Sequence, residues 1–395
     1  MTSSAPPTST TSLPNTFDAL GLLPALCQAA QRSGLARPTE IQKMGIPALL
    51  EGRDVLLPSQ TGTGKTAAFV LPALQKLAAL KEREGHETPS IPRVLILEPT
   101  RDLAMQTAGV CRQLGRQLPI RTRVVCGGVS RDQQERALAD GADIIVATHG
   151  RLLETVERGD LILSDIIYLV LDEADRLLDE EFSASMTALV PYLADRPQTV
   201  FCSATLPEPV MALAKKVTRN PVRVEIAEDN LTPRRLTQRA IFVEEDEKET
   251  LLKQIAAHHL PEGRCILFVK TKQRADAIAR FMRRCGANAH SLHGGQTPGE
   301  RKKALARFQN NTGNVLVTTD IAARGLDIDD IQMVVNVDLP PKPDTYVHRI
   351  GRTARAGRKG RALSFIPLNE RTILRDIERH ISHRIRIVTV ETLDQ

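Results

Sequence analysis

The sequence IIYLVLDEAD, at residues 166–175, joins a run of six apolar residues to three carboxylates. A short run that is apolar on both faces is typical of a buried strand in a parallel sheet. Asp172 follows this run directly, and open α/β sheets bind their ligands at the carboxyl ends of strands. Taken alone, the carboxylates also fit the solvated start of a helix. The stretch predicts an α/β fold and makes Asp172 and Glu173 candidate site residues.

A second stretch, SQTGTGKT at residues 59–66, favours the ligand-binding interpretation. It follows a predicted strand at 55–57 and precedes a helical pattern, which is the context of a phosphate-binding loop. Its glycines let backbone N–H groups converge on phosphate oxygens, backed by the positive end of the helix. Lys65 would reach the β- and γ-phosphates, and the Thr66 hydroxyl would ligate Mg²⁺. The strict pattern has glycine where this chain has Ser59, but the context predicts a nucleoside triphosphate site.

The acidic residues complete this site. Asp172 would hold the magnesium ion through water, and Glu173 would orient or deprotonate the attacking water. Ser203 and Thr205 follow another predicted strand, and their hydroxyls would hydrogen-bond the acidic cluster. Read alone, either hydroxyl also fits a helix cap.

Short apolar runs alternate with helical patterns in both halves of the chain, which predicts two doubly wound parallel-sheet domains. We expect strands at 55–57, 94–97, 123–126, 144–147, 167–171 and 199–202, then at 240–243, 265–269, 315–318, 333–337 and 362–366. The expected helices include 65–77, 102–114, 248–258, 272–285, 299–309 and 369–380. A polar stretch containing Pro233 interrupts the pattern and is typical of a linker. The predicted organisation is a disordered tail at 1–16, a first domain at 17–226, a flexible linker at 227–238, a second domain at 239–387 and a tail at 388–395.

Composition narrows the function class. The formal charge of +6 suits a polyanionic partner and fits a basic soluble enzyme equally well. Aromatic residues are 3% of the chain and Trp is absent, so a nucleic acid would be held by its backbone rather than by base stacking. The six cysteines form no Cys-x-x-Cys pair, which argues against zinc and for a reducing, cytoplasmic location. No apolar run approaches the roughly 20 residues that a membrane helix needs.

The second half carries a dense basic block, YVHRIGRTARAGR, at residues 346–358. Arg352 and Arg355 are three residues apart and can share a helix face or adjoining turn. Arginines supplied from another domain stabilise the transition state in many phosphate-cleaving enzymes. A basic face that is solvated or binds phosphodiester backbone is the plainer interpretation.

In this order, the loop, the acidic tetrad, Ser-Ala-Thr and the His-Arg block resemble the DEAD-box ATP-dependent RNA helicases. The resemblance covers about residues 17–383. It implies tandem RecA-like domains that bind ATP, Mg²⁺ and RNA, with local duplex unwinding or RNA–protein remodelling driven by RNA-stimulated ATP hydrolysis. It also implies an adenine-sensing motif in which Gln42 pairs with the base, Phe17 stacks on it and Arg37 lies nearby. Phosphate contacts would come from Ser59, Gln60, Thr61, Gly62, Thr63, Gly64, Lys65 and Thr66, and Asp327 would touch the ribose.

The remaining implied roles concern RNA and coupling. Arg352 and Arg355 would reach the γ-phosphate, and Asp175 would be coupled through Ser203, Thr205, Arg324 and His348 to the second domain. RNA would be held along its backbone, with little sequence preference. Its contacts would be Pro99, Thr100, Arg101, Gly127, Gly128, Thr148, Arg151, Lys270, Thr271, Arg301 and Thr319.

Four positions depart from the family pattern: Asp102, His149, Pro298 and Ala354. Ala354 stands where the family usually has glycine, so a positive φ there would strain the backbone and displace Arg355. The resemblance suits a monomer that acts in ribosome assembly or RNA turnover on single-stranded and duplex RNA. Two alternatives remain at this stage: an RNA clamp with negligible unwinding, and a DNA helicase of the same superfamily.

Overall fold

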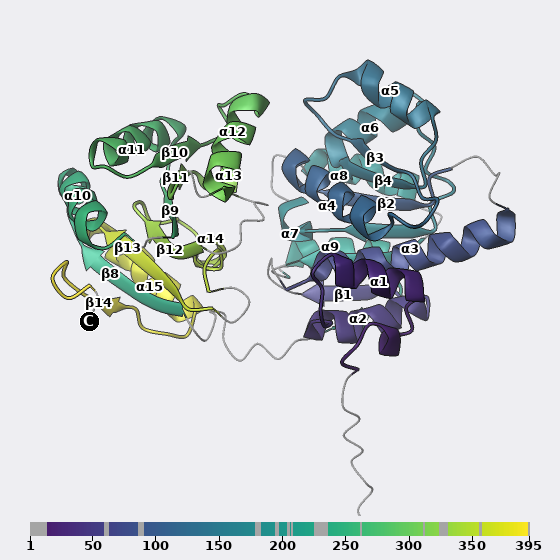
Figure 1. Cartoon of the computed structure of the whole chain (residues 1–395), viewed down its shortest axis with the longest axis horizontal. Coiled ribbons are helices and arrows are strands. Elements are labelled where there is room, and N and C mark those ends of the chain that lie inside the picture. The colour runs from purple at the N-terminus through teal and green to yellow at the C-terminus, as the bar shows by residue number, and fades with distance from the viewer. Residues whose placement is uncertain are drawn as a thin grey trace, which may run out of the picture. The chain divides into compact units, whose positions relative to one another are not determined.

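A computed structural model describes residues 14–58, 63–85, 91–177, 183–193, 197–203, 206, 208–224, 236–260, 263–310, 313–323, 331–354 and 358–393. The chain divides into two compact units between Ala227 and Glu228. Each unit contains one parallel sheet with helices on both faces (Figure 1). The predicted fold class, two doubly wound parallel-sheet domains, is confirmed.

The first sheet has the strand order β3-β4-β2-β5-β6-β1-β7. Its strands are β1 (Val55–Pro58), β2 (Val94–Glu98), β3 (Thr122–Val125), β4 (Ile144–Thr148), β5 (Tyr168–Leu171), β6 (Gln198–Ser203) and β7 (Val222–Arg223). Its helices are η1 (Asp18–Leu20), α1 (Pro24–Arg32), α2 (Glu40–Leu50), α3 (Lys65–Glu84), α4 (Arg101–Leu114), α5 (Arg131–Ala139), α6 (His149–Glu157), α7 (Ala174–Leu177), α8 (Ser183–Leu189), η2 (Val190–Leu193) and α9 (Glu208–Val217).

Alternation along the central strands explains why both faces of this sheet are covered. In β5, Tyr168 and Val170 pack into the core cluster shared with α1–α4, whereas Leu169 and Leu171 pack into the cluster shared with α6, α8 and α9. A strand that is buried on both faces must be apolar throughout, as the run at 166–171 is.

The second sheet has the order β10-β11-β9-β12-β13-β8-β14. Its strands are β8 (Leu236–Phe242), β9 (Arg264–Phe268), β10 (Ala289–Leu292), β11 (Val315–Thr318), β12 (Ile331–Asn336), β13 (Gly360–Ile366) and β14 (Arg386–Ile387). Its helices are η3 (Glu245–Glu247), α10 (Lys248–His258), α11 (Lys272–Arg284), α12 (Pro298–Gln309), α13 (Asp320–Ala323), α14 (Pro343–Ile350), η5 (Leu368–Glu370) and α15 (Arg371–His380).

Two boundaries differ from the prediction. β8 begins at Leu236, so the last three residues of the predicted linker belong to the sheet, where they pair with β13. Residues 225–235 lie outside the described residues. At the other end, the predicted tail after residue 387 is wrong for its first part. Val388 and Leu393 are buried in the core beside α10 and α11, because their apolar side chains complete that cluster.

All six cysteines are free, and four of them are buried. Within the part of the chain that the structure describes, none of the helices combines the length and the apolar character needed to cross a membrane.

Candidate functional site

The carboxyl edge of the first sheet brings the predicted ATP-binding residues together. β5, β6 and β1 are neighbours and run in the same direction, so the residues that follow them meet at one edge. Asp172 follows β5, Ser203 ends β6, and Lys65 opens α3 after the loop that follows β1. Residues 59–62 of that loop, and Thr205, lie outside the described residues.

Gln42 joins the first turn of α2 to the start of α3. Its side chain is fully buried. The amide Oε1 accepts the Thr39 N–H at 2.9 Å, and Nε2 donates to the Gly64 carbonyl at 3.0 Å. Thr39 Oγ1 adds a bond to the Thr63 carbonyl at 2.9 Å. The predicted adenine-binding amide is therefore held against Gly64, the residue just before helix α3.

Gly64 cannot be replaced without disturbing this contact. It is the N-cap of α3 and has a φ of 91°, in the left-handed region. A Cβ at this position would lie 2.5 Å from Gln42 Nε2. Conformation and space both require glycine here, which accounts for the GK pair at 64–65.

Asp172 and Glu173 form a tight, buried turn after β5. The Asp172 N–H donates to the Leu97 carbonyl at 3.0 Å, and Asp172 Oδ1 accepts the Glu173 N–H at 2.8 Å. Glu173 has a φ of 47°, which is uncommon for a residue with a side chain. Such conformations cost about 1–3 kcal/mol and cluster at functional sites.

Glu98 is a third carboxyl at this edge, and the sequence analysis did not single it out. It ends β2, is completely buried, and accepts the Thr107 hydroxyl at 2.5 Å. Burial, and then the nearby Asp172 carboxylate, raise the pKa of Glu98 well above its ordinary value, although Lys65 acts against this rise. An acidic residue at the end of the apolar run VLIL was the signal that could have found it.

The other predicted nucleotide contacts are Phe17 and Arg37 at the base and Asp327 at the ribose. Phe17 is only 4% exposed and packs in the apolar core with Leu20 and Leu22. Its ring is therefore part of the core rather than an open stacking surface. Arg37 is exposed on the segment before α2. Asp327 lies outside the described residues.

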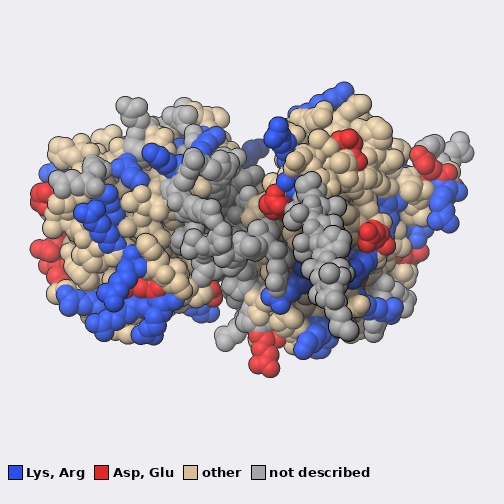
Figure 2. All heavy atoms as spheres, turned by 90° about the horizontal axis from the view of Figure 1, so that it is seen from below, with Lys and Arg blue, Asp and Glu red and all other residues tan. Residues whose placement is uncertain are grey.

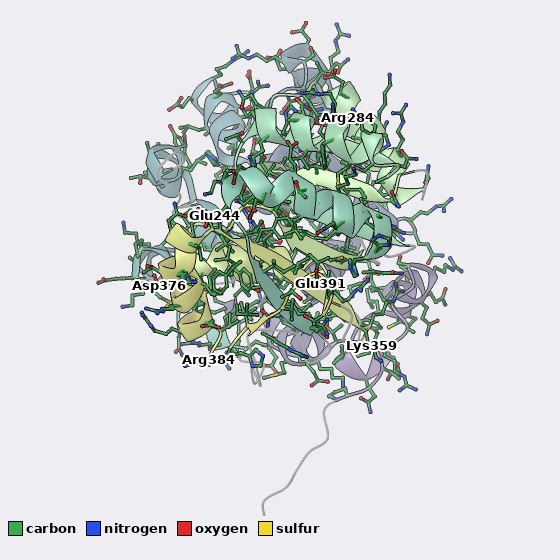
Figure 3. All side chains as sticks on the ribbon, turned by 90° about the vertical axis from the view of Figure 1, so that its left-hand side faces the viewer. Glu244, Arg284, Lys359, Asp376, Arg384 and Glu391 are labelled. Atoms are coloured by element: carbon green, nitrogen blue, oxygen red, sulfur yellow. The ribbon has the colours of Figure 1, made fainter. Side chains whose placement is uncertain are left out.

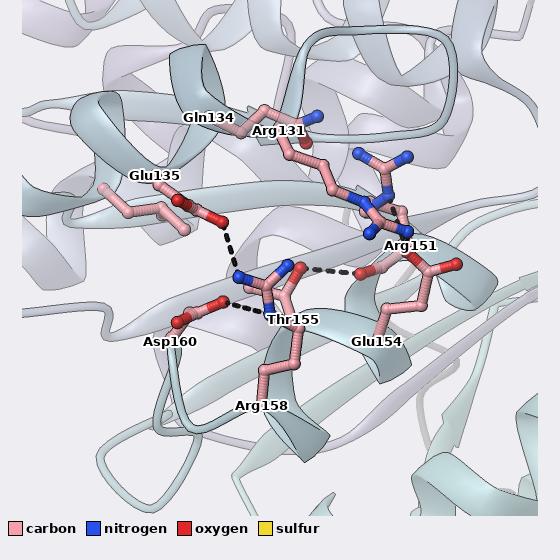
Figure 4. A pocket seen from close by; sticks show the side chains of 9 residues that line it. Arg131, Gln134, Glu135, Arg151, Glu154, Thr155, Arg158 and Asp160 are labelled. Carbon is pink, nitrogen blue, oxygen red and sulfur yellow. Dashed lines mark hydrogen bonds and ion pairs between the residues drawn. The ribbon is translucent and has the colours of Figure 1, made fainter.

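The predicted RNA contacts of the first unit surround the loop after β3. Arg101 donates to the Gly128 carbonyl at 2.9 Å, and the left-handed Gly128 leaves room for that guanidinium. Arg151 Nε lies 3.1 Å from a Glu154 carboxylate oxygen, which also lies 3.3 Å from Arg131 (Figure 4). Pro99 and Gly127 flank these groups in the chain.

The first turns of two helices hold the remaining contacts of this unit. Thr100 caps α4 by accepting the Leu103 N–H at 3.3 Å, and Asp102 lies in that helix's first turn. Thr148 precedes α6, whose first residue is His149. His149 is buried, and burial lowers the pKa of its imidazole. Helix α6 thus begins with a histidine at the position where the sequence analysis noted a departure from the family pattern.

In the second unit, Lys270 and Thr271 follow β9 at the carboxyl edge. Thr271 caps α11 by accepting the Arg274 N–H at 3.2 Å, and the Lys270 N–H donates to Asp338 at 2.9 Å. Asp338 is buried and also pairs with Lys248 Nζ and Arg274 Nε, each at 2.9 Å. Burial alone would raise the pKa of Asp338, but the Lys270 N–H and the two cations outweigh it and lower the pKa.

Arg349 organises the rest of this edge, a role that the sequence analysis did not assign. Its buried guanidinium makes two hydrogen bonds to Asp320, at 2.6 and 2.8 Å. It also donates to Asn336 Oδ1 at 3.0 Å and to the Asp338 carbonyl at 2.6 Å, and it lies over the Phe268 ring at 4.9 Å. Three strand ends are thereby tied to α14.

Four more of the predicted arginine, coupling and RNA residues of this unit are described in the structure. His348 is half-buried in α14, and Arg352 and Thr319 are buried. Arg301 lies in α12, one turn after its capped start. Arg324 and Arg355 are outside the described residues, as is the side chain of Pro298.

Ala354 adopts the backbone that its position in the motif suggested. Its φ is 58°, in the left-handed region that favours glycine. Gly360 faces it, and a Cβ on Gly360 would lie 2.6 Å from the Ala354 nitrogen. The sequence analysis stated strain as conditional on a positive φ, and that condition holds.

The arrangement suits a magnesium–nucleotide complex better than a metal held by protein alone. Among the described residues, no group of three or more His, Cys, Asp or Glu side chains could hold a metal ion. Mg²⁺, however, usually binds one or two carboxylates together with substrate phosphates and water. The buried Asp172 carboxylate and the Thr66 hydroxyl, at the second residue of α3, fit that donor set.

Comparison with known proteins agrees with this geometry. A family model described as DEAD/DEAH box helicase matches residues 39–213, and one described as helicase conserved C-terminal domain matches residues 247–357. The chain is 36% identical over 370 residues to the ATP-dependent RNA helicase DbpA of Bacillus subtilis, covering 94% of this chain and 75% of that protein. It is 37% identical over 379 residues to the ATP-dependent RNA helicase SrmB of Escherichia coli, covering 96% and 84%.

A solved structure is similar over nearly the whole chain. S. cerevisiae Dbp5 bound to RNA and ADP BeF3 has a TM-score of 0.84 and 32% identity, covering 96% of this chain and 97% of that one.

Proposed function

We propose roles for the site residues of this chain, which belongs to the DEAD-box family of ATP-dependent RNA helicases and therefore hydrolyses ATP to act on RNA. The observation that carries the proposal is the buried turn at Asp172 and Glu173, beside the start of α3. A nucleotide bound at the helix start would present its terminal phosphates toward these carboxylates, and this supports the proposed roles.

Gln42 would bind the adenine edge with the hydrogen-bonding capacity that its two internal bonds leave. A primary amide offers two donor hydrogens and two acceptor lone pairs, and Gln42 uses one of each within the protein. The buried Gln42 amide would transmit base binding to the Gly64 backbone and so to the phosphate-binding helix. Phe17 would stack on the base, Arg37 would lie nearby, and Asp327 would contact the ribose.

Hydrolysis would use the groups at the carboxyl edge. Lys65 would neutralise the β- and γ-phosphates, and Thr66 and Asp172 would hold the magnesium ion. That ion would neutralise the charge that develops on the phosphate oxygens. Glu173 would orient the attacking water and accept its proton, since the strained turn holds its backbone in one conformation.

The second unit would supply positive charge in addition to Lys65. Arg352 and Arg355 would stabilise the γ-phosphate in the transition state. Asp175, Ser203, Thr205, Arg324 and His348 would link nucleotide binding to the state of the second unit. ATP and RNA would then favour the same active state, which is positive coupling between two sites.

RNA would be held by its phosphates and 2′-hydroxyls along both carboxyl edges. In the first unit the contacts would be Pro99, Thr100, Arg101, Gly127, Gly128, Thr148 and Arg151. In the second they would be Lys270, Thr271, Arg301 and Thr319. Backbone contacts position the strand without specifying sequence, so the protein would act locally on many RNAs.

The test is RNA-stimulated ATP turnover by Glu173→Gln. Removing a general base typically lowers turnover by about 10²–10⁴-fold. The control is Glu157→Gln, which removes an exposed carboxylate from α6 in the same unit. Equal turnover in the wild type and Glu173→Gln would remove Glu173 from the mechanism.

An RNA clamp with slow turnover is the second candidate, and the left-handed Ala354 favours it. Strain at this residue would misplace Arg355 and slow hydrolysis without weakening RNA binding. Tight ATP-dependent RNA binding combined with negligible unwinding would select the clamp. For the cellular role we propose a cytoplasmic monomer acting in ribosome assembly or RNA turnover. Crosslinking and sequencing of the bound RNA would identify its targets.

A further inference from the structure

Helix α15 presents a row of arginines on the side opposite its buried face. Leu374 and Ile377 pack into the core with β8 and β13. Arg371, Arg375 and Arg379 are exposed and recur at every fourth residue. With a rise of 1.5 Å per residue, successive Cα atoms in this row are about 6 Å apart.

The row continues beyond the helix as a strongly basic segment. Residues 371–386 contain five arginines and two carboxylates, a formal excess of three positive charges out of six for the whole chain. Arg384 and Arg386 are exposed, and Arg386 lies in the edge strand β14. Lys and Arg side chains gather on this unit in Figure 2, and Figure 3 shows Arg384 at its outer surface.

The two carboxylates of the segment do little to neutralise it. Glu378 accepts the Ile385 N–H at 2.8 Å and is therefore engaged in closing the end of the helix. Asp376 lies 3.1 Å from Arg379, but the two side chains are 48% and 77% exposed. Exposed pairs of this kind contribute little and are screened by salt. The arginines thus remain available to a polyanion.

One end of the row adjoins a predicted RNA contact. Glu370, the N-cap of α15, binds Lys270 Nζ at 2.6 Å. The next residue, Arg371, lies over the Phe242 ring at 4.7 Å, at the carboxyl end of β8. Lys270 and the start of the row therefore lie at the same edge of the second sheet.

We propose that the row Arg371–Arg375–Arg379, continued by Arg384 and Arg386, is an additional binding surface for the RNA backbone. RNA held at Lys270 extends along α15, and its phosphates bind guanidinium groups in succession. Guanidinium forks match phosphate geometry, and residues 371–386 contain no Phe, Tyr or Trp to stack bases. The surface is therefore indifferent to sequence and lengthens the RNA segment held. The inference rests on the proposed role of Lys270.

The experiment compares RNAs of increasing length. The variant is Arg375→Gln with Arg379→Gln, and the control is Arg280→Gln with Arg284→Gln, an exposed pair at the same spacing on α11. Binding of single-stranded oligonucleotides is measured by fluorescence anisotropy over a range of salt, with a non-hydrolysable ATP analogue. Short RNAs should bind the wild type, the variant and the control equally.

Long RNAs should separate the proteins. Each phosphate contact with a single strand contributes about 0.7 to the slope of log affinity against log salt. Loss of two contacts should lower that slope by about 1.4 for long RNAs in the variant and leave it unchanged in the control. Melting temperatures should be unchanged, since both arginines are exposed.

If the variant binds long RNA with the wild-type slope of log affinity against log salt, the proposal is overturned. The row then binds either no ligand or an acidic protein segment instead of RNA. An equal loss in the control would also overturn it, because general basicity would then explain the effect. Lys270→Gln separates this failure from failure of the proposed function. If Lys270 contacts RNA, its replacement lowers the affinity for short and long RNAs alike. An unchanged affinity for short RNA would remove Lys270 from the proposed RNA contacts, and the comparison of long RNAs between the arginine variant and its control could still be interpreted.

Discussion

The two units have the same strand order but group their charged side chains differently at the carboxyl edge of the sheet. Numbered from its own first strand, each sheet runs 3-4-2-5-6-1-7. In both, a threonine after the second strand caps the following helix, Thr100 in one and Thr271 in the other. The first unit gathers three carboxyl groups at this edge, Glu98, Asp172 and Glu173, with Lys65 nearby. The second unit pairs opposite charges there: Asp338 with Lys248, and Arg349 with Asp320.

This difference separates a ligand site from a structural one on a shared topology. Carboxylates brought together in a buried site favour a cation or a proton among them. A carboxylate surrounded by lysine, arginine and N–H donors is already satisfied and holds the strand ends in place. We therefore expect the first edge to lose function, and the second to lose stability, when a carboxylate is removed.

The largest effect should follow Asp338→Ala. It leaves Lys248, which is 1% exposed, without its buried partner, and breaking a buried pair costs about 3–5 kcal/mol. Amide hydrogen exchange in β9 and β12 should accelerate accordingly. Asp172→Asn should leave exchange in the first sheet nearly unchanged while abolishing ATP turnover. Similar acceleration in both variants would break the comparison.

Glu98→Gln should change the pH dependence of stability. Because the folded-state pKa of Glu98 is raised, its proton stabilises the fold fully below about pH 4.5, and this stabilisation is lost as the pH rises through the folded-state pKa. The Gln variant keeps an acceptor for the Thr107 hydroxyl, and its stability does not fall in this way because its amide does not ionise. Its stability relative to wild type should rise by about 1.4 kcal/mol per pH unit across this window.

Urea denaturation between pH 4 and 8 would measure the difference. The control is Glu157→Gln, an exposed carboxylate in the same unit. A constant offset between wild type and Glu98→Gln at all pH values would show that folding does not raise the pKa of Glu98.

The smallest effect should follow Ala354→Gly. Removing the Cβ from a left-handed residue should stabilise the second unit by about 1 kcal/mol. Gly360→Ala should do the opposite, because its Cβ would lie 2.6 Å from the Ala354 nitrogen. Thermal unfolding of the two variants gives the signs. Turnover in Ala354→Gly that exceeds wild type would place the residue among those that tune hydrolysis, whereas equal or lower turnover would contradict the argument that strain at Ala354 slows hydrolysis.

The sequence predicted the long buried strands well, because strands covered on both faces are apolar throughout. It missed β7, β10 and β14. β7 and β14 contain two residues each, and β10 (Ala289–Leu292) has polar residues at its centre. Such strands are held by pairing with a neighbour, as Ala289 to Leu292 pair with β11, and not by a pattern of their own. The three residues of β8 assigned to a linker were misread for the same reason.

The phosphate-binding loop and the acidic tetrad could be singled out from the sequence, since phosphate chemistry demands particular side chains at fixed spacing, and the other motif residues followed from the family resemblance. Their supports could not be identified in this way. Glu98 acquires its raised pKa first because it is buried, and second because β2 lies beside β5 and so brings it near Asp172. Arg349 becomes an organiser only because three strand ends converge on α14. Neither relation exists within a short stretch of chain.

By itself, then, the sequence determined the two α/β units, the nucleotide chemistry and the family, because each depends on local patterns: apolar runs, glycine spacing and motif order. Only the tertiary structure decided which carboxylates share one edge of a sheet, which cationic side chains form ion pairs and which arginines remain exposed. Those properties depend on burial and on distances between residues far apart in the chain. The same surroundings decide whether the pKa of a charged group is raised or lowered.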